Sequence, residues 1–263
     1  MAQFTKALAR CPPGRARRWV DASISLIHGL FPPSCYLCLD PGQAPALELC
    51  RGCEEDLPRN HAACPRCGET DSDGQPCADC RRHAPGFDAA FVPYCYEFPL
   101  PELIHRFKYR GQLAIGRMLG TLLGRRLAER GRPRVDAIVP VPLHPAREAR
   151  RGYNQAREIA GFVGSALGLP LRDGLVRRIR DTEEQAALPG IVRAANVSGA
   201  FGLRGLPPLR VAIVDDVLTT GATANAVARV LREGGCRHIE VWAVARAGAG
   251  PTERPLPFRA PDP

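Results

Sequence analysis

The chain has 263 residues, of which 45% are hydrophobic and 24% charged, and its formal net charge is +9. This length allows one main domain with a small additional module, and the composition is that of a globular protein with an ordinary core. No apolar run approaches the roughly 20 residues that span a bilayer, and the first residues have no apolar signal-peptide core. We therefore expect a cytoplasmic protein without a transmembrane segment.

The positive charge is concentrated in residues 100–180, which contain seventeen Arg or Lys against six Asp or Glu. Such a region suits an anionic ligand, either a polyphosphate or a nucleic acid, although a solvated basic surface has the same composition. Only Lys6 and Lys108 are lysines, so the abundant arginines individually indicate little. Because a compact ammonium is not interchangeable with a guanidinium, Lys108 is the more specific candidate for ligand contact.

Four parts are predicted along the chain. Residues 1–33 contain a helical segment, because apolar residues recur at helical spacing from residue 15 until Pro32 and Pro33 end the run. Residues 34–86 have paired cysteines and short polar turns, with too little apolar sequence to fold without a metal. Residues 87–247 form the main domain, and residues 248–263 are a Pro-rich tail that we expect to be disordered.

The main domain alternates between strand and helix patterns. We predict strands over residues 91–98, 135–141, 211–214 and 239–245, and helices over residues 101–109, 113–129, 154–167 and 222–234. This order predicts an α/β fold with a mostly parallel sheet flanked by helices. Residues 177–205 are polar and have no clear period, which is typical of a functional loop.

Eight of the eleven cysteines form CxxC pairs. The pairs are Cys35 and Cys38, Cys50 and Cys53, Cys64 and Cys67, and Cys77 and Cys80. Two residues between the thiols let both sulfurs of a tight turn face one ion, and two such turns complete the four-thiolate shell of a structural zinc site. The spacing therefore predicts a double zinc ribbon with two Zn²⁺ ions and no open coordination position for catalysis.

Disulfides and redox-active pairs are the alternatives for these cysteines. A cytoplasmic chain does not keep disulfides, and a redox CxxC opens a helix in a βαβ context rather than occurring four times in succession. We expect the pairs to join in sequence order, first with second and third with fourth. A cross-braced arrangement, first with third and second with fourth, is the other possibility. Cys11, Cys95 and Cys236 have the pattern of ordinary buried or terminal thiols.

An acidic pair and a turn of small residues follow the strand predicted over residues 211–214. Asp215 and Asp216 stand at its carboxyl end, where ligands of open α/β sheets bind. A turn then leads directly into a helix; its residues are Thr219, Thr220, Gly221, Ala222 and Thr223. Backbone N–H groups at a helix N-terminus favour a phosphate.

The two carboxylates suit a different part of a ligand. They can accept hydrogen bonds from the vicinal hydroxyls of a ribose, and they place negative charge where an oxocarbenium ion could form. Asp215 and Asp216 are therefore the candidate catalytic residues, and residues 219–223 form a candidate monophosphate cradle. A helix cap for the acids and a plain loop for the turn are the simpler alternatives, but the ordered combination is specific.

The segment VAIVDDVLTTGAT, residues 211–223, resembles the signature of the type I phosphoribosyltransferases. The resemblance implies binding of phosphoribosyl pyrophosphate (PRPP) with Mg²⁺, with Asp215 and Asp216 on the ribose hydroxyls and residues 219–223 on the 5′-phosphate. It also implies that residues 140–144, which follow a strand at 137–139, belong to a pyrophosphate loop and that residues 177–196 are a flexible loop over the site.

A second resemblance extends over almost the whole chain. The CxxC module, FKYRG, VPVPLHPAREARRGYNQA, RDTEEQ…RAANVSGAF and VDDVLTTGAT are together similar to the ComF family of competence-associated, phosphoribosyltransferase-like proteins. In the flexible loop the family spacing is kept, but the segment AALPGIV departs from the usual polar text. The residues that match in the loop are Thr182, Gln185, Arg193, Asn196 and Phe201.

Other residues matching the family carry candidate roles. Lys108, Arg147 and Arg151 are candidates for the pyrophosphate, since arginine suits forked phosphate contacts, although each could be a surface residue. Tyr153 could stack on a ligand or pack internally, and His144 could transfer a proton. Asn154 precedes a predicted helix, where an N-cap residue belongs.

Three functions are compatible with this pattern. The first is transfer of the phosphoribosyl group to an acceptor that the sequence does not identify. The second is a PRPP-binding module in DNA uptake, with single-stranded DNA or competence proteins as partners. The third is a PRPP-sensing regulator, for which the only support is analogy.

Overall fold

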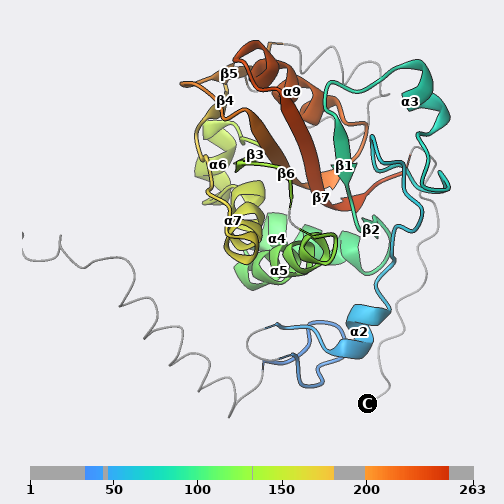
Figure 1. The fold of residues 1–263 in the computed structure, drawn as a ribbon. Helices are drawn as coiled ribbons and strands as arrows, with labels where there is room; N and C mark the ends of the chain where they lie inside the picture. The colour runs from blue at the N-terminus through green and yellow to red at the C-terminus, as the bar shows by residue number, and fades with distance from the viewer. Residues whose placement is uncertain (1–32, 44–46, 132, 181–198, 249–263) are drawn as a thin grey trace, which may run out of the picture.

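The computed structural model describes residues 33–43, 47–131, 133–180 and 199–248 (Figure 1). The predicted N-terminal helix and all of the Pro-rich tail except its first residue lie outside these ranges. The four loop positions Thr182, Gln185, Arg193 and Asn196 lie outside them as well.

The main sheet has five parallel strands. The two long central strands are β6 (Arg210–Leu218) and β7 (His238–Arg246), which pair with each other. β3 (Ala137–Pro140) pairs with the free side of β6, and β1 (Ala89–Phe91) and β2 (Tyr94–Cys95) pair with β7. The predicted mostly parallel α/β architecture is therefore confirmed.

Helices cover both faces of this sheet (Figure 1). On one face lie α4 (Leu100–Arg110), α5 (Leu113–Glu129) and α7 (Gln155–Leu167), and on the other lies α9 (Ala222–Glu233). Successive residues of β6 alternate between the two cores: Ala212 and Val214 face the first, and Val211 and Ile213 face the second. A strand buried on both faces must be apolar at every position, which explains its continuous apolar run.

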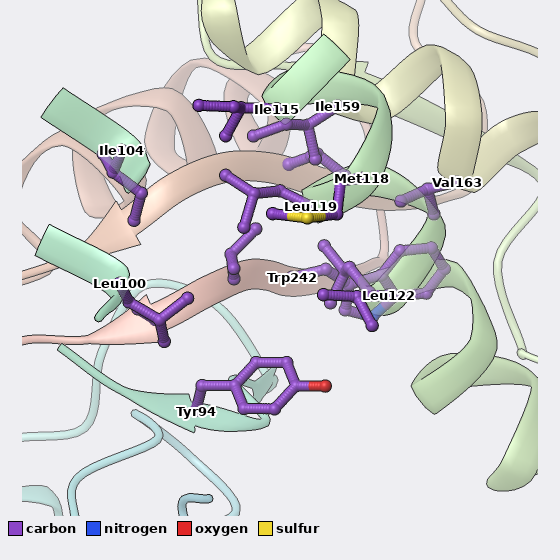
Figure 2. Close-up of a cluster of buried hydrophobic side chains, with 14 of the residues drawn as sticks. Tyr94, Leu100, Ile104, Ile115, Met118, Leu119, Leu122, Ile159, Val163 and Trp242 are labelled. Atoms are coloured by element: carbon purple, nitrogen blue, oxygen red, sulfur yellow. The ribbon is translucent and has the colours of Figure 1, made fainter. Parts of the chain in front are cut away.

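The larger core lies between β7 and two closely packed helices. Figure 2 shows Trp242 of β7 near Met118 and Leu122 of α5, and all three side chains are fully buried. Two glycines let α5 approach α7, because a Cβ on Gly120 would lie 2.8 Å from Phe162 Cβ and one on Gly124 would lie 2.9 Å from Ala166 Cβ.

Some predicted elements have different bounds in the structure. The strand predicted over residues 91–98 is divided into β1 and β2, because Pro93 between them has no N–H for a ladder hydrogen bond. α6 (Pro145–Arg151) was not predicted; His144 caps it and Pro145 opens it. The predicted functional loop begins and ends in an antiparallel pair, β4 (Val176–Arg178) and β5 (Phe201–Leu203).

Candidate functional site

The eight paired cysteines form two clusters. Within each cluster all ligand sulfurs lie within 4.8 Å of one another, and the members are Cys35, Cys38, Cys50 and Cys53, and Cys64, Cys67, Cys77 and Cys80. The pairs are therefore joined in sequence order, not cross-braced. Sγ of Cys38 lies 3.6 Å from Sγ of Cys50, and Sγ of Cys67 lies 3.7 Å from Sγ of Cys77. A tetrahedral shell with Zn–S of about 2.3 Å requires S–S separations of about 3.8 Å, so both clusters fit zinc.

The two clusters share one local plan. After the first cysteine of each, the chain turns back: the amides of Cys35 and Cys64 donate to the carbonyls of Asp40 (2.7 Å) and Glu69 (2.8 Å). The third cysteine of each cluster precedes a short helix, α2 (Arg51–Glu55) or α3 (Ala78–Arg82). The second ribbon thus repeats the first, although the sequences between the cysteines differ.

Backbone N–H groups prepare the sulfurs for metal binding. The amides of Leu37 and Cys77 lie 3.5 and 3.3 Å from the sulfurs of Cys35 and Cys64. Burial opposes ionisation of Cys35, but the backbone N–H groups around its sulfur lower the pKa of this thiol to about 7. Such N–H···S contacts are suited to stabilising thiolates, the form that binds zinc.

Both ribbons are attached to the main domain by separate contacts. Glu48 of the first ribbon forms a short ion pair with Arg117 of α5, and Leu49 beside it is fully buried in the larger core. In the second ribbon the Pro65 carbonyl accepts from Ala90 of β1 at 3.0 Å. Figure 1 shows the corresponding positions, with α2 near α5 and α3 near β1.

The acidic pair lies inside β6 rather than after it. The predicted strand ended at Val214, but β6 continues to Leu218 because Val217 and Leu218 pair with Ala245 and Arg246 of β7. The backbone amide of Asp216 donates to Asp215 Oδ1 at 2.9 Å. Burial, and then the neighbouring Asp216 charge, raise the pKa of the Asp215 carboxyl well above its usual range. Perturbed acids of this kind are typical of functional sites.

Lys108 is brought directly to this pair from α4. Its Nζ lies 2.5 Å from Asp216 Oδ2, and the two side chains are 19% and 4% exposed. The Lys108 charge also lowers the pKa of Asp215, although burial has the larger, opposite effect. The lysine that stood out in the sequence therefore neutralises part of the acidic site.

The small-residue turn leads from β6 to α9. Gly221 adopts a left-handed conformation with φ of 75°, which a glycine takes without strain, and α9 begins at Ala222. The Thr220 hydroxyl accepts from the Ala222 amide at 3.4 Å. Since first-turn amides of a helix have no acceptor within that helix, this turn presents N–H donors next to the acidic pair.

The FKYRG and RGYNQ segments pack against each other. The rings of Phe107 and Tyr153 are stacked with centroids 5.4 Å apart, and the Tyr153 hydroxyl donates to the Phe107 carbonyl. The Arg151 guanidinium lies 5.5 Å from the centre of the Tyr109 ring. Tyr153 therefore packs internally. Arg151 of α6 contacts Tyr109 of α4, the residue that follows Lys108.

The remaining candidates have defined local roles. Asn154 is the N-cap of α7, as predicted: its Oδ1 accepts from the Ala156 amide and its Nδ2 donates to the Val141 carbonyl, both at 3.0 Å. The Val141 amide donates to Val214 at 2.9 Å, so residues 141–144 start beside the acidic pair. His144 Nδ1 accepts from the Ala146 amide at 3.3 Å, and Arg147 lies half-buried in the first turn of α6.

Arg246 is a residue at this site that the sequence analysis missed. It ends β7, where the preceding residues are apolar, and it is only 7% exposed. Its guanidinium donates to the carbonyls of Leu218 and Thr219 at the start of the cradle. A charged residue ending an apolar strand was the available signal, since burial of an arginine requires partners.

The chain is similar to known proteins over its zinc ribbons and over most of its length. A family model for a double zinc ribbon domain matches residues 26–81, which include all eight paired cysteines. Competence protein F of Haemophilus influenzae is 38% identical over 210 residues, covering 76% of this chain and 90% of that protein. DNA utilization protein YhgH of Salmonella typhi is 32% identical over 222 residues, covering 82% and 97%. A purine phosphoribosyltransferase from Pyrococcus horikoshii overlaps 54% of this chain and 91% of its own, with 20% identity and a TM-score of 0.31.

The fold and the site define a parallel α/β protein with an acidic pair near the carboxyl end of a central strand and a double zinc ribbon. At 38% identity over most of both chains, the similarity to competence protein F identifies the family. The chain belongs to the ComF family of competence proteins. Within the described residues, none of the helices has the length and apolar character needed to cross a membrane.

Proposed function

We propose that the chain binds PRPP with Mg²⁺ at the carboxyl end of β6. The observation that carries this proposal is the acidic pair inside β6, which is followed within three residues by the small-residue turn and faced by Lys108. The carboxylates of Asp215 and Asp216 would accept the ribose hydroxyls, and Thr219, Thr220, Gly221, Ala222 and Thr223 would hold the 5′-phosphate.

Cations near the acidic pair would bind the pyrophosphate. Lys108 is paired with Asp216, and Arg151 lies over the ring of Tyr109, the residue that follows Lys108 in α4. Arg147 is in the first turn of α6. The segment before this helix, residues 141–144, begins next to β6. Mg²⁺ prefers oxygen ligands and is commonly held by carboxylates together with substrate phosphates, so the donor set fits this ion.

Asp215 and Asp216 would also act in catalysis if transfer occurs. Cleavage of the bond between the anomeric carbon and pyrophosphate leaves positive charge on the ribose, and carboxylates at this position would stabilise it. An acceptor with an unshared electron pair would then bond to the anomeric carbon on the opposite face while pyrophosphate departs. The described residues near the pair would orient the ribose; the acceptor itself is not defined by them.

Calorimetry with PRPP and Mg²⁺ tests the binding proposal. We expect wild-type protein to bind and the Asp215→Asn/Asp216→Asn variant to bind at least about 100-fold more weakly, because hydrogen bonds to charged groups contribute about 1.5–3 kcal/mol each. A matched control removes two carboxylates elsewhere, Asp136→Asn/Asp173→Asn, whose ion pairs lie at the surface. No binding by the wild type, or equal loss in the control, would contradict the proposal.

A role in DNA uptake is the cellular setting that we propose for this site. The relatives are named for competence and for DNA utilization. One observation favours a direct contact with nucleic acid: an open hollow of about 420 Å³ is lined by three arginines and one acid, namely Arg172, Arg177, Arg204 and Asp173. All three arginines are exposed, and such a basic hollow suits a phosphate backbone.

Salt dependence of single-stranded DNA binding tests this contact. We expect affinity to fall steeply with salt, with a log–log slope of roughly −0.7 per phosphate neutralised. Replacing Arg172, Arg177 and Arg204 by Ala should make that slope shallower by about 2. The same charge change in the second ribbon is the control, with Arg66, Arg81 and Arg82 replaced. A flat salt response, or a larger effect in the ribbon control, would contradict the assignment.

A screen for pyrophosphate release separates an enzyme from a binding module. Protein, PRPP and Mg²⁺ would be incubated with a panel of bases and amines, and pyrophosphate would be measured. Release that requires one acceptor and is absent in Asp215→Asn/Asp216→Asn would establish transfer. PRPP binding without release for any acceptor would instead favour the non-catalytic module or the PRPP sensor.

A further inference from the structure

Arg246 holds the backbone at the start of the cradle. Its side chain is 8% exposed and lies at the end of β7. Nη1 donates to the carbonyl of Leu218 at 2.9 Å and to that of Ala247 at 2.6 Å, and it makes a close contact with the Thr219 carbonyl. Because the guanidinium presents its donors in a rigid plane, these contacts restrict where Thr219 can lie.

The other terminal nitrogen of the same guanidinium binds the second zinc ribbon. Arg246 Nη2 donates to Glu69 Oε2 at 2.5 Å, across 177 residues of sequence. Glu69 is itself fixed by the cysteine turn, since its carbonyl accepts from the Cys64 amide at 2.8 Å. Beside it, Gly68 packs so tightly that a Cβ there would lie 2.8 Å from Val92 Cγ2. The carboxylate is therefore positioned by the part of the ribbon that begins one cysteine cluster.

We propose that Arg246 is a positioning residue for the phosphate cradle and that the second cysteine cluster sets its position through Glu69. A buried guanidinium is costly unless it is paired, and Glu69 supplies the carboxylate. Without that partner, Arg246 gains by turning toward water, and the Leu218 and Thr219 carbonyls lose their donor. Metal binding at the second cluster then controls the order of a loop in another part of the protein.

The first ribbon provides an internal comparison. A different acid of that ribbon, Glu48, pairs with Arg117 in α5, one of the helices on the face opposite α9. That ion pair also joins a ribbon to the main domain, but in the described part of the chain it is not itself hydrogen-bonded or ion-paired to residues 218–222. Breaking it should leave the cradle unchanged. The expected coupling is therefore specific to the second ribbon rather than a general effect of loosening either one.

Hydrogen exchange of residues 218–222 tests the proposal without any ligand. Wild type, Glu69→Gln and Glu48→Gln are compared as full chains. In Glu69→Gln we expect exchange of this loop to accelerate by about fivefold or more, because local opening follows the loss of the contacts that hold it. In Glu48→Gln the loop should exchange as in wild type. Equal exchange in all three proteins, or equal acceleration in both variants, would overturn the coupling.

Two further measurements separate positioning from misfolding. Arg246→Lys keeps the charge but cannot bond the loop and Glu69 with one planar group, so its loop should exchange like that of Glu69→Gln while zinc content stays unchanged. Cys77→Ser, which removes a ligand of the second cluster, should accelerate the loop more than Cys50→Ser, its counterpart in the first. The reverse order for the two cysteine variants would overturn the proposal.

The consequence for ligand binding rests on the proposed function. If residues 219–223 bind the 5′-phosphate, Glu69→Gln should weaken PRPP binding by about the same factor as it accelerates loop exchange. If wild-type protein does not bind PRPP, the exchange result still decides whether Arg246 positions the loop. The two proposals therefore fail independently.

Discussion

Replacing Cys50 by Ser is expected to reduce the bound zinc from two ions per chain to one and to unfold the first ribbon. The four sulfurs of that cluster lie within 4.8 Å of one another, and removing one leaves an incomplete tetrahedral shell. Structural zinc in small ribbons contributes an apparent binding free energy of about 10–16 kcal/mol, which is folding free energy for the segment that holds it. Metal analysis of freshly purified protein and limited proteolysis of residues 34–86 would measure both effects.

Cys95 and Cys236 provide matched controls for this variant. Both are thiols outside the two clusters, so Cys95→Ser and Cys236→Ser should retain two zinc ions. The main sheet should persist in Cys50→Ser, because most of its core comes from β6, β7 and the helices that cover them, although Leu47 and Leu49 of the first ribbon also belong to it. Well under two zinc ions in wild-type protein, or equal zinc loss in a control, would refute the double zinc ribbon.

Replacing Lys108 by Met is expected to destabilise the fold by about 3 kcal/mol, since removing one partner of a buried ion pair leaves an uncompensated charge. The Lys108 ammonium lies 2.5 Å from an Asp216 carboxylate that is only 4% exposed. For a chain of this size, the melting temperature should fall by about 6–12 °C. Thermal unfolding followed by circular dichroism measures this change.

The loss in Lys108→Met should depend on pH. Burial and then Asp216 already raise the pKa of Asp215 above its usual range, and the Lys108 charge opposes them. A folded-state pKa above the unfolded value means that the native state binds the proton more tightly, so stability falls as pH rises through this window. Without the Lys108 charge, the folded-state pKa of Asp215 should be higher still, so the pH range over which stability falls extends further upward. The variant should therefore be closer to wild type near pH 5 than at pH 7.

A second substitution distinguishes charge from packing in this variant. Lys108→Met/Asp216→Asn replaces both charged partners, so it should recover part of the lost melting temperature if the unpaired carboxylate is the cause. Arg106→Met, on the same helix in an exposed ion pair with Glu102, is the surface control and should change stability by less than about 1 kcal/mol. No recovery in the double variant would show that the loss in Lys108→Met comes from packing.

The sequence determined the local chemistry of this protein. CxxC spacing alone places two sulfurs on one turn, and the cysteines gather into two clusters in sequence order as predicted. The acidic pair, small-residue turn and helix are also consecutive in sequence, and α9 begins at Ala222 as expected. These features could be predicted because each depends on residues a few positions apart, within reach of one turn of backbone.

Strand bounds were predicted less well because pairing partners decide them. The apolar run in β6 stops at two carboxylates, yet the strand continues to Leu218 through its ladder with β7. The strand predicted over residues 91–98 is divided at Pro93, which cannot donate to a ladder. In both cases the decisive contact lies on a neighbouring strand, where sequence periodicity carries no information.

Only the tertiary structure decided which distant residues meet at the acidic pair. Lys108 reaches Asp216 because α4 covers one face of the sheet near the end of its central strand. Arg246 joins the cradle to Glu69 because β7 lies between β6 and the strands on which the second ribbon docks. Sequence marks these residues as unusual in charge or type, but the order of strands in the sheet determines their partners. A buried charge is stable only when it is paired, and the partner must be a residue that the fold brings next to it.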